Sequence, residues 1–249
     1  GDQTPPLDGV GDILETARPD GGVTTWFATR KGLVRRDGTR WQRFSAATSP
    51  LRGDYIASLA QSDLAPYTNA APWQLTADAE RIVRERIATC GDDFTVAGNV
   101  AVHRSAQIEP GAAIKGPALI GPNCFIASTA LIRGGCWLER DVIIGPSAEL
   151  KTSFIFAGSK LAHLNFVGDS VLGAGVNIEA GAMIANYRNE RTDKRIRIKL
   201  DGALIDTGVE KFGALLGDGA RIGANAVIAP GAILAKGAIV PRLSLIDQG

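Results

Sequence analysis

An aliphatic residue recurs every six positions over more than half of this chain. The unbroken series comprises Val96, Val102, Ile108, Ile114, Ile120, Ile126, Ile132, Leu138, Ile144, Leu150 and Phe156. The period shifts around Ala162, and the series then continues through Val167, Leu172, Ile178, Ile184, Leu216, Ile222, Ile228, Leu234 and Val240. Two residues before each member stands a mostly small residue, such as Ala106, Ala118, Cys124 or Cys136. This period fits neither a helix nor an alternating strand, and it predicts a hexapeptide β-solenoid.

The period also predicts how the chain turns. A short strand points its aliphatic residue inward, and Gly, Pro, Asn or Asp then makes a corner, as at Gly116-Pro117 and Gly145-Pro146. Three strands close one coil, so residues eighteen apart are expected to stack at roughly the 4.8 Å spacing of neighbouring strands.

Residues 1–50 do not follow this rhythm. The segments 22–33 and 41–44, with Asp37-Gly38 between them, predict two or three short strands with turns. They resemble one unit of a β-propeller repeat of the kind found in two-component regulators, but a single unit cannot close a propeller. We expect an N-terminal extension of irregular or small-β structure.

Residues 51–93 predict a linker and a capping helix. Thr76 is the expected N-cap, Asp78 and Glu80 lie in the first turn, and Gly91 follows the last turn. The apolar face of this helix suits a cap laid across the open first coil, whose strand edges are otherwise exposed.

The solenoid is expected over residues 94–249, with one insertion at about 188–210. Residues 195–200 alternate between basic and aliphatic, and Asp201-Gly202 supplies a turn, so the insertion predicts a projecting β-hairpin. Its basic side either contacts a phosphate group or faces solvent.

Composition narrows the classes of partner. The chain has 249 residues, 45% of them hydrophobic, and its 27 Lys and Arg balance 26 Asp and Glu, which indicates neither nucleic acid nor a membrane surface as a partner. No apolar run approaches the roughly 20 residues that span a bilayer, and the first residues lack a signal-peptide pattern. The expected location is cytoplasmic. With two histidines, the three-histidine metal site of carbonic anhydrase is not expected.

Three cations recur at the stacking interval. Lys115, Arg133 and Lys151 each follow an inward aliphatic residue and are eighteen residues apart. They are expected to form a vertical basic ladder on one face. Like charges so close repel unless an anion or acidic neighbours intervene, so the ladder is a candidate site for a phosphate or sugar phosphate, or else a coincidence of surface residues.

Motifs around His163 resemble a known family. They are Glu149-Leu150-Lys151, Gly158-Ser159-Lys160-Leu161-Ala162-His163-Leu164, Val167-Gly168-Asp169, Val176-Asn177-Ile178-Glu179-Ala180-Gly181 and Ala185-Asn186-Tyr187. The series is similar to the acetyltransferase domain of bifunctional UDP-N-acetylglucosamine pyrophosphorylase / glucosamine-1-phosphate N-acetyltransferase, a hexapeptide-repeat acyltransferase. The match extends more weakly across about 95–242.

The resemblance implies a left-handed parallel β-helix that assembles as a homotrimer, with active sites in the clefts between subunits. It implies that His163 is the general base, with Glu149 as an acidic partner near it. The residues implied to hold the amino-sugar phosphate or line its pocket are Arg133, Lys151, Asn177, Asn186, Tyr187 and Lys211. Ala180 is implied to contact the acetyl end of acetyl-CoA, the co-substrate.

The chemistry suits such residues. A sugar amine must lose a proton as it attacks the thioester, and a neutral imidazole near its natural pKa can accept it. Backbone N–H groups can stabilise the oxyanion, and the transfer requires no metal. The chain departs from the family where Phe166 replaces a tyrosine and Glu179 replaces a glycine, which leaves the identity of the sugar open.

Residues 1–93 lack the Gly-rich loop of the pyrophosphorylase half. Nucleotidyl transfer is therefore not expected, and the resemblance, together with the basic ladder, predicts an acetyl-CoA-dependent N-acetyltransferase acting on an amino-sugar phosphate or a nucleotide-linked amino sugar. Two alternatives stay open: an O-acyltransferase acting on a UDP-sugar, and a non-catalytic solenoid that binds sugar nucleotides or serves as a scaffold.

Overall fold

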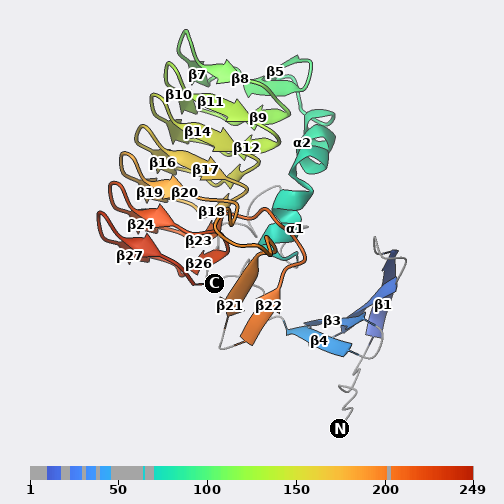
Figure 1. Cartoon of the computed structure of the whole chain (residues 1–249). Coiled ribbons are helices and arrows are strands. Elements are labelled where there is room, and N and C mark those ends of the chain that lie inside the picture. Colours follow the sequence, from blue (N-terminus) through green and yellow to red (C-terminus); the bar gives the residue numbers. More distant parts are fainter. Residues whose placement is uncertain are drawn as a thin grey trace.

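In a computed structural model of the protein, residues 10–17, 23–29, 32–37, 40–45, 64, 70–200 and 203–248 are described. The chain winds into stacked coils, and each coil contributes short strands to three parallel sheets (Figure 1). Sheet I contains β5 (Phe94–Ala97), β6 (Val100–His103), β9 (Ala118–Ile120), β12 (Cys136–Leu138), β15 (Phe154–Ile155), β18 (Val171–Leu172), β23 (Ala214–Leu216) and β26 (Ala232–Leu234).

The other two sheets form the remaining faces of the solenoid. Sheet II contains β7 (Gln107–Ile108), β10 (Phe125–Ile126), β13 (Ile143–Ile144), β16 (Lys160–Leu161), β19 (Asn177–Ile178), β24 (Arg221–Ile222) and β27 (Ile239–Val240). Sheet III contains β8 (Ala113–Ile114), β11 (Leu131–Arg133), β14 (Glu149–Lys151), β17 (Phe166–Gly168), β20 (Met183–Ile184), β25 (Val227–Ile228) and β28 (Leu245–Ile246). The predicted fold class, mainly β with a left-handed parallel β-helix and a small-β N-terminal extension, is confirmed.

The two predicted columns form the interior of the solenoid. Ile126, Ile144 and Ile178 are fully buried, as are the small residues Cys124 and Cys136 that pack beside them. Burial raises the pKa of each of these two thiols to about 11, so both remain protonated at neutral pH. The sequence-based expectation of compact buried cysteines therefore holds.

Two residues of the predicted aliphatic series, Val96 and Phe156, do not point into the solenoid as expected. Val96 is 49% exposed because β5 runs antiparallel to β6 and closes the first coil as a hairpin. Phe156 lies outside the inner column, and Ile155 takes its place opposite Leu138. The period is therefore shortened earlier than expected, at the corner that holds Ser153.

The shortened corners are stabilised by buried hydroxyl groups. Ser153 Oγ donates to the carbonyl of Lys151 at 2.8 Å and accepts the N–H of Ser170 at 3.0 Å. Ser170 Oγ in turn donates to the carbonyl of Gly168 and accepts the N–H of Ala214. These bonds satisfy backbone groups at the point where one residue is missing from each coil.

The N-terminal extension is an antiparallel sheet in the order β1-β2-β3-β4. Its strands are β1 (Val10–Ala17), β2 (Val23–Thr29), β3 (Gly32–Asp37) and β4 (Arg40–Ser45). Strands were expected within 22–33 and 41–44, and β1 is an additional one. The expected turn at Asp37-Gly38 falls partly outside the described residues.

The helices do not lie where the sequence analysis placed them. Instead of one helix with Thr76 as its N-cap, α1 (Pro72–Ala77) begins with Pro72, and α2 (Ala79–Ile87) follows Asp78. Both run alongside the coils rather than across the first one (Figure 1). Because sheet I is apolar on its outer side as well as its inner side, the helices gain more burial there than at the open end.

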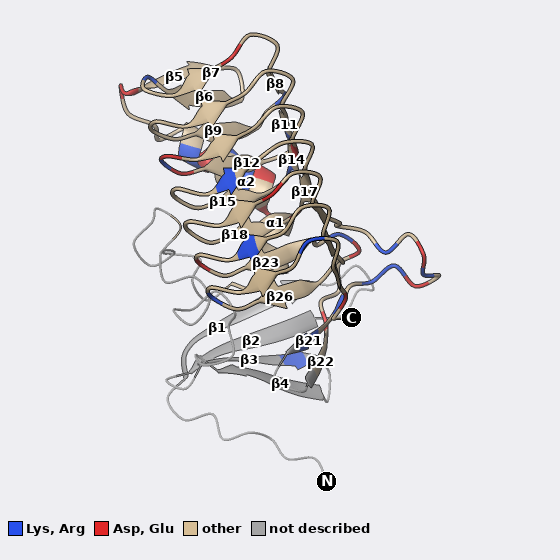
Figure 2. Ribbon diagram, turned by 90° about the vertical axis from the view of Figure 1, so that its left-hand side faces the viewer, with Lys and Arg blue, Asp and Glu red and all other residues tan. Residues whose placement is uncertain are grey.

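The helices and the outer side of sheet I form a second core. Trp73, Leu75 and Val83 are buried against a layer that includes Trp137 and Phe154. The opposite side of α2 carries charged residues (Figure 2). These form ion pairs along the helix, among them Arg81 with Glu85 and Arg84 with Glu80. No helix in the described part of the chain is long and apolar enough to cross a bilayer.

The insertion contains the predicted hairpin, formed by β21 (Arg197–Leu200) and β22 (Ala203–Asp206). The pairing of Leu200 with Ala203 agrees with a turn at residues 201–202, which lie outside the described residues. Ile196 and Ile198 are fully buried in the second core, so the base of the hairpin packs on the solenoid. Its basic residues are partly neutralised, because Arg195 and Arg197 both pair with Asp193.

Candidate functional site

The basic ladder predicted on sheet III is present. Arg133 lies directly opposite Lys151 across β11 and β14, and the N–H of Lys115 donates to the carbonyl of Ile132 in the same sheet. Acidic neighbours reduce the repulsion within the ladder, since Arg133 and Lys151 each have a carboxylate partner. Lys115 is exposed and makes no ion pair within the described part of the chain.

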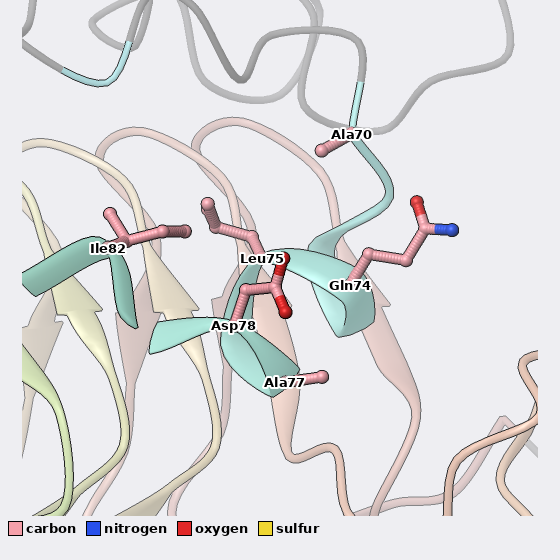
Figure 3. A pocket seen from close by; sticks show the side chains of 6 residues that line it. All are labelled: Ala70, Gln74, Leu75, Ala77, Asp78 and Ile82. Atoms are coloured by element: carbon pink, nitrogen blue, oxygen red, sulfur yellow. The ribbon is translucent and has the colours of Figure 1, made fainter. Parts of the chain in front are cut away.

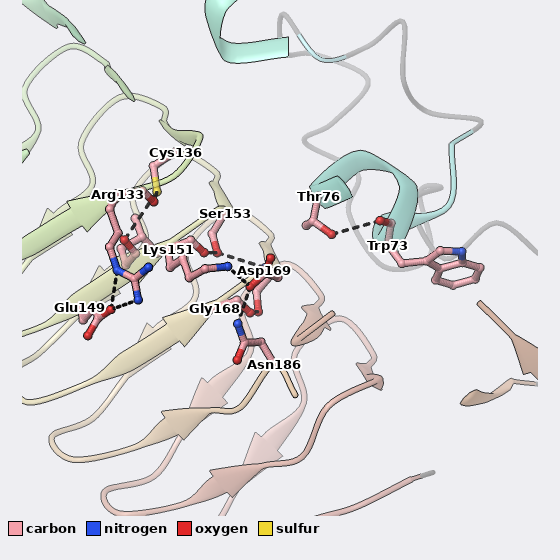
Figure 4. Close-up of polar contacts among 12 residues, drawn as sticks. Trp73, Thr76, Arg133, Cys136, Glu149, Lys151, Ser153, Gly168, Asp169 and Asn186 are labelled. Carbon is pink, nitrogen blue, oxygen red and sulfur yellow. Dashed lines mark hydrogen bonds and ion pairs between the residues drawn. The ribbon is translucent and has the colours of Figure 1, made fainter. Parts of the chain in front are cut away.

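Arg133 is held by Glu149 on the next coil. Its Nη2 lies 2.6 Å and its Nε 2.8 Å from Glu149 Oε1 (Figure 4). The two side chains are 39% and 33% exposed, so the guanidinium keeps further N–H donors accessible to an anion. Glu149 was expected near the general base, but the contact that its carboxylate makes in the structure is with Arg133.

Asp169 joins two of the expected substrate-binding residues. Lys151 Nζ lies 2.7 Å from Asp169 Oδ2, and the Asn186 side-chain amide donates to the same oxygen (Figure 4). The Asp169 side chain is only 9% exposed and that of Lys151 18%. The carboxylate therefore fixes the position of an ammonium group and an amide that come from different coils.

Gly168 makes room for this arrangement. A Cβ at this position would lie 2.7 Å from Asn186 Nδ2 and 2.8 Å from the Phe166 ring, closer than real contacts allow. The sequence motif Val167-Gly168-Asp169 had drawn attention to this segment without a role for Asp169. The signal that could have assigned one is the eighteen-residue interval from Lys151 to Asp169, which continues the interval of the basic ladder; the shortened corner puts Gly168 directly opposite Lys151 and Asp169 next to it.

His163 lies at the corner between sheets II and III. Its imidazole is exposed and has no hydrogen-bond partner among the described residues. Ala180 occupies the same corner one coil further on, because the N–H of Gly181 donates to the carbonyl of His163 at 3.0 Å. The next coil continues this stack, with the N–H of Asn225 donating to the carbonyl of Ala180. The structure thus places the expected base and the expected acetyl-contacting residue on adjacent coils.

Glu179, one of the departures from the family, is engaged beside Ala180. Its carboxylate accepts hydrogen bonds from Arg242 Nε at 2.7 Å and from the backbone N–H of Ala224 at 2.9 Å. The hydrogen bond from the Arg242 guanidinium lowers the pKa of Glu179 below its usual value, and the Ala224 N–H acts in the same direction. The added carboxylate is therefore ionised and fixed at the corner.

The other residues expected from the sequence are Asn177, Tyr187 and Lys211. Asn177 is exposed on sheet II, on the strand that leads to Ala180. Tyr187 is 37% exposed, with Lys194 Nζ 5.4 Å from its ring centre. Lys211 is exposed at the other end of the insertion, next to Phe212, whose N–H donates to the carbonyl of Asn186 at 3.2 Å.

A hollow of about 330 Å³ lies elsewhere, beside α1 and the start of α2 (Figure 3). Leu75, Asp78 and Ile82 are among the residues that line it. None of the residues that the sequence singled out for substrate binding or catalysis contributes to this hollow. The candidate site is therefore the open surface of sheets II and III and the corner that joins them.

Comparisons with known proteins find relatives of part of this chain. The family model described as the GMPPB C-terminal domain matches residues 96–188. A bifunctional sugar-1-phosphate nucleotidylyltransferase/acetyltransferase from Sulfurisphaera tokodaii is 35% identical over 136 residues, 55% of this chain and 33% of that protein. The bifunctional protein GlmU of Methanococcus maripaludis is 33% identical over 151 residues, 59% of this chain and 36% of that protein. The chain thus spans about a third of the length of these curated relatives.

Solved structures with similar folds are more distant. A putative acetyltransferase from Bacillus cereus aligns with 56% of this chain and 71% of its own, at 17% identity and a TM-score of 0.43. A variant of the N-acyltransferase AntD from Bacillus cereus, in complex with dTDP and coenzyme A, aligns with 63% of this chain and 81% of its own, at 15% identity and a TM-score of 0.34. The sequence matches confirm the resemblance to a bifunctional nucleotidylyltransferase/acetyltransferase and to GlmU.

Proposed function

We propose that the solenoid is an acyltransferase that moves an acetyl group from acetyl-CoA to the amino group of an amino-sugar phosphate or a nucleotide-linked amino sugar. The observation that carries this proposal is the corner between sheets II and III. There an exposed imidazole, with no hydrogen-bond partner among the described residues, stands one coil from Ala180. The relative from Sulfurisphaera tokodaii, which is named as a nucleotidylyltransferase/acetyltransferase, supports the same reaction class.

The reaction needs a base and an anion-binding face, and the chain offers both. The amine nitrogen attacks the thioester carbonyl and forms the N–C bond, while His163 accepts the proton from the nitrogen. The C–S bond then breaks, and the imidazolium returns the proton to the leaving thiolate. Arg133 and Lys151, oriented by Glu149 and Asp169, bind the phosphate of the acceptor.

The segments at the base of the insertion complete the acceptor site in this proposal. Because Phe212 is bonded to Asn186, the two ends of the insertion meet beside Asp169. Tyr187 and Lys211 therefore lie near the group that holds Lys151. We expect three copies of the chain to assemble, as the resemblance implies, with each site completed by a neighbouring subunit.

Two histidine variants test this function. The chain is incubated with acetyl-CoA and a panel of amino-sugar 1-phosphates and UDP-amino sugars, and release of free thiol is followed. His163→Ala is expected to lower kcat by roughly 10²- to 10⁴-fold, the usual contribution of a general base. His103→Ala is the matched control, because His103 Nδ1 is bonded to Ser105 Oγ at 2.8 Å in the first coil.

Near-normal turnover by His163→Ala with the best substrate would show that His163 is not the base. An ester product on a sugar hydroxyl, or a preference for a longer acyl chain, would instead favour the O-acyltransferase alternative. Binding of sugar nucleotides without any thiol release would favour a non-catalytic solenoid.

A further inference from the structure

A second cationic column stands on the outer side of sheet II. Lys160 pairs with Asn177, and Asn177 pairs with Arg221, so the three residues occupy equivalent positions on β16, β19 and β24. All three side chains are exposed, whereas the residue that follows each of them is buried in the core. With strands spaced by about 4.8 Å, the two cations lie on backbone positions about 10 Å apart, with an amide between them.

The cations of this Lys160–Asn177–Arg221 column differ from those of the ladder on sheet III in having no carboxylate partners among the described residues. Arg133 and Lys151 are each paired with a carboxylate of the same chain. Within the described part of the chain, neither Lys160 nor Arg221 has such a partner. Two unpaired cations about 10 Å apart still repel weakly at physiological salt, where the screening length is about 8 Å. An anion bound between them would remove that repulsion.

The carboxylate of Glu179, on the same strand connection as Asn177, already has partners of its own. Glu179 follows Asn177 by two residues, but its oxygens are occupied by Arg242 and by the N–H of Ala224. It therefore does not neutralise the Lys160–Asn177–Arg221 column. The positive charge of this face is left available to a ligand from solution.

The column leads directly to the proposed reaction centre. Lys160 lies three residues before His163, and Asn177 lies three residues before Ala180. At about 3.3 Å per residue, the side chains of the column begin roughly 10 Å from that corner. A substrate with its reacting group at the corner could therefore extend its anionic part along sheet II.

We propose that Lys160, Asn177 and Arg221 form a subsite for the diphosphate of a nucleotide-type substrate. The subsite rests on the proposed acyl transfer and deepens it. Two long cationic side chains separated by a neutral amide donor match two linked phosphates, since each phosphate can meet one cation and the amide can donate to an oxygen between them. Coenzyme A and a nucleotide-linked amino sugar both carry a diphosphate, and the site requires only that shared group.

Calorimetric titration of the full chain tests the subsite with three probes: coenzyme A, UDP and inorganic phosphate. Lys160→Ala and Arg221→Ala are each expected to weaken binding of one diphosphate probe by about 5- to 30-fold, the loss of one charge-assisted hydrogen bond. Arg221→Lys is expected to retain most of the affinity, because it keeps the charge. Inorganic phosphate is expected to bind much more weakly than the affected probe.

Arg104→Ala is the matched control. Arg104 is exposed, lies in the first coil and has no side-chain partner among the described residues. Its loss removes the same charge without touching sheet II near His163, so unchanged affinity is expected. A weaker affinity for coenzyme A alone assigns the subsite to the acyl donor, and a weaker affinity for UDP alone assigns it to a nucleotide-linked acceptor.

Other outcomes overturn the subsite. They are wild-type protein that binds neither diphosphate probe, unchanged affinity in both alanine variants, or an equal loss in Arg104→Ala. These results are separable from those on the proposed function, because binding is measured without turnover. His163-dependent thiol release with unchanged affinities would leave the function standing and the subsite wrong. Weakened binding without any acetyl transfer would leave the subsite standing and the reaction wrong.

Discussion

Asp169 is the residue on which the phosphate-binding face depends, although it is not itself expected to touch the substrate. It accepts hydrogen bonds from Lys151 and Asn186, and its backbone N–H donates to the carbonyl of Lys151 at 2.8 Å. A lysine ammonium on four rotatable bonds has no preferred direction of its own. The buried carboxylate supplies that direction, which makes Asp169 a positioning residue in the proposed reaction.

Asp169→Asn tests how much the buried Asp169–Lys151 pair stabilises the fold, compared with a pair that is more exposed. The amide keeps one acceptor but removes the charge opposite Lys151, whose side chain is only 18% exposed, so we expect a loss of about 2 kcal/mol in the free energy of unfolding. Glu149→Gln is the control: its pair with Arg133 is 33–39% exposed, and a loss below about 1 kcal/mol is expected. Urea unfolding measures both. Equal losses would mean that burial does not distinguish the two pairs.

At the scale of the element, the alternation of residues 195–200 predicts which side of the hairpin is buried, but not which surface covers that side. The apolar members Ile196 and Ile198 are buried, and the basic members lie toward solvent, as the alternation predicts. The partner surface was not predictable. It consists of Gly231, where an added Cβ would meet Ile196 at 2.8 Å, and of the outer side of sheet I.

Two aliphatic residues of the hairpin give a matched test of that packing. Ile198 is fully buried, and truncation to alanine is expected to lower the free energy of unfolding by about 2–4 kcal/mol, because a large buried side chain leaves a cavity. Leu204 on the opposite strand is 65% exposed, and Leu204→Ala is expected to change it by less than about 0.5 kcal/mol. Chemical denaturation compares the two. A small effect of Ile198→Ala would mean that the hairpin is not part of the cooperative core.

Stacking explains how much of the site the sequence could predict. Arg133 and Lys151 are eighteen residues apart, so the regular period predicts that they stack on adjacent coils. Lys160 and Asn177 are seventeen apart because one corner is shortened, and Asn177 and Arg221 are forty-four apart because the insertion separates two adjacent coils. No fixed interval finds this second column. The expected columns were therefore those that the uninterrupted period could bring together.

The helices illustrate a different limit. The pattern of α2 correctly predicts an apolar face, but an apolar face does not say which surface will cover it. Trp137 and Phe154 occupy outward positions on sheet I, and they are the residues that make this face a better partner than the open first coil. Reading those two positions as outward and aromatic would have been the signal to place the helices along the side of the solenoid.

At the scale of the whole molecule, the three faces have different chemistry. Sheet I is covered by the helices and the base of the hairpin. Sheet II carries the Lys160–Asn177–Arg221 column. Sheet III carries an apolar column of outward residues in direct register, interrupted at Glu149: Leu131, Phe166, Met183, Val227 and Leu245. Of these, Met183, Val227 and Leu245 are 43%, 39% and 67% exposed, so sheet III offers a run of apolar residues that an assembly can bury.

The homotrimer implied by the resemblance can be tested on that apolar column. If sheet III contacts a second copy, Val227→Glu would bury a charge without a partner and would weaken assembly by several kcal/mol, so a shift from trimer to monomer is expected in sedimentation equilibrium. Ile239→Glu is the control, because Ile239 is 64% exposed on sheet II, and it is expected to leave the trimer intact. If Ile239→Glu dissociates the trimer and Val227→Glu does not, the contact lies on sheet II, where it would compete with the diphosphate subsite. A monomeric wild-type chain would contradict the trimer itself.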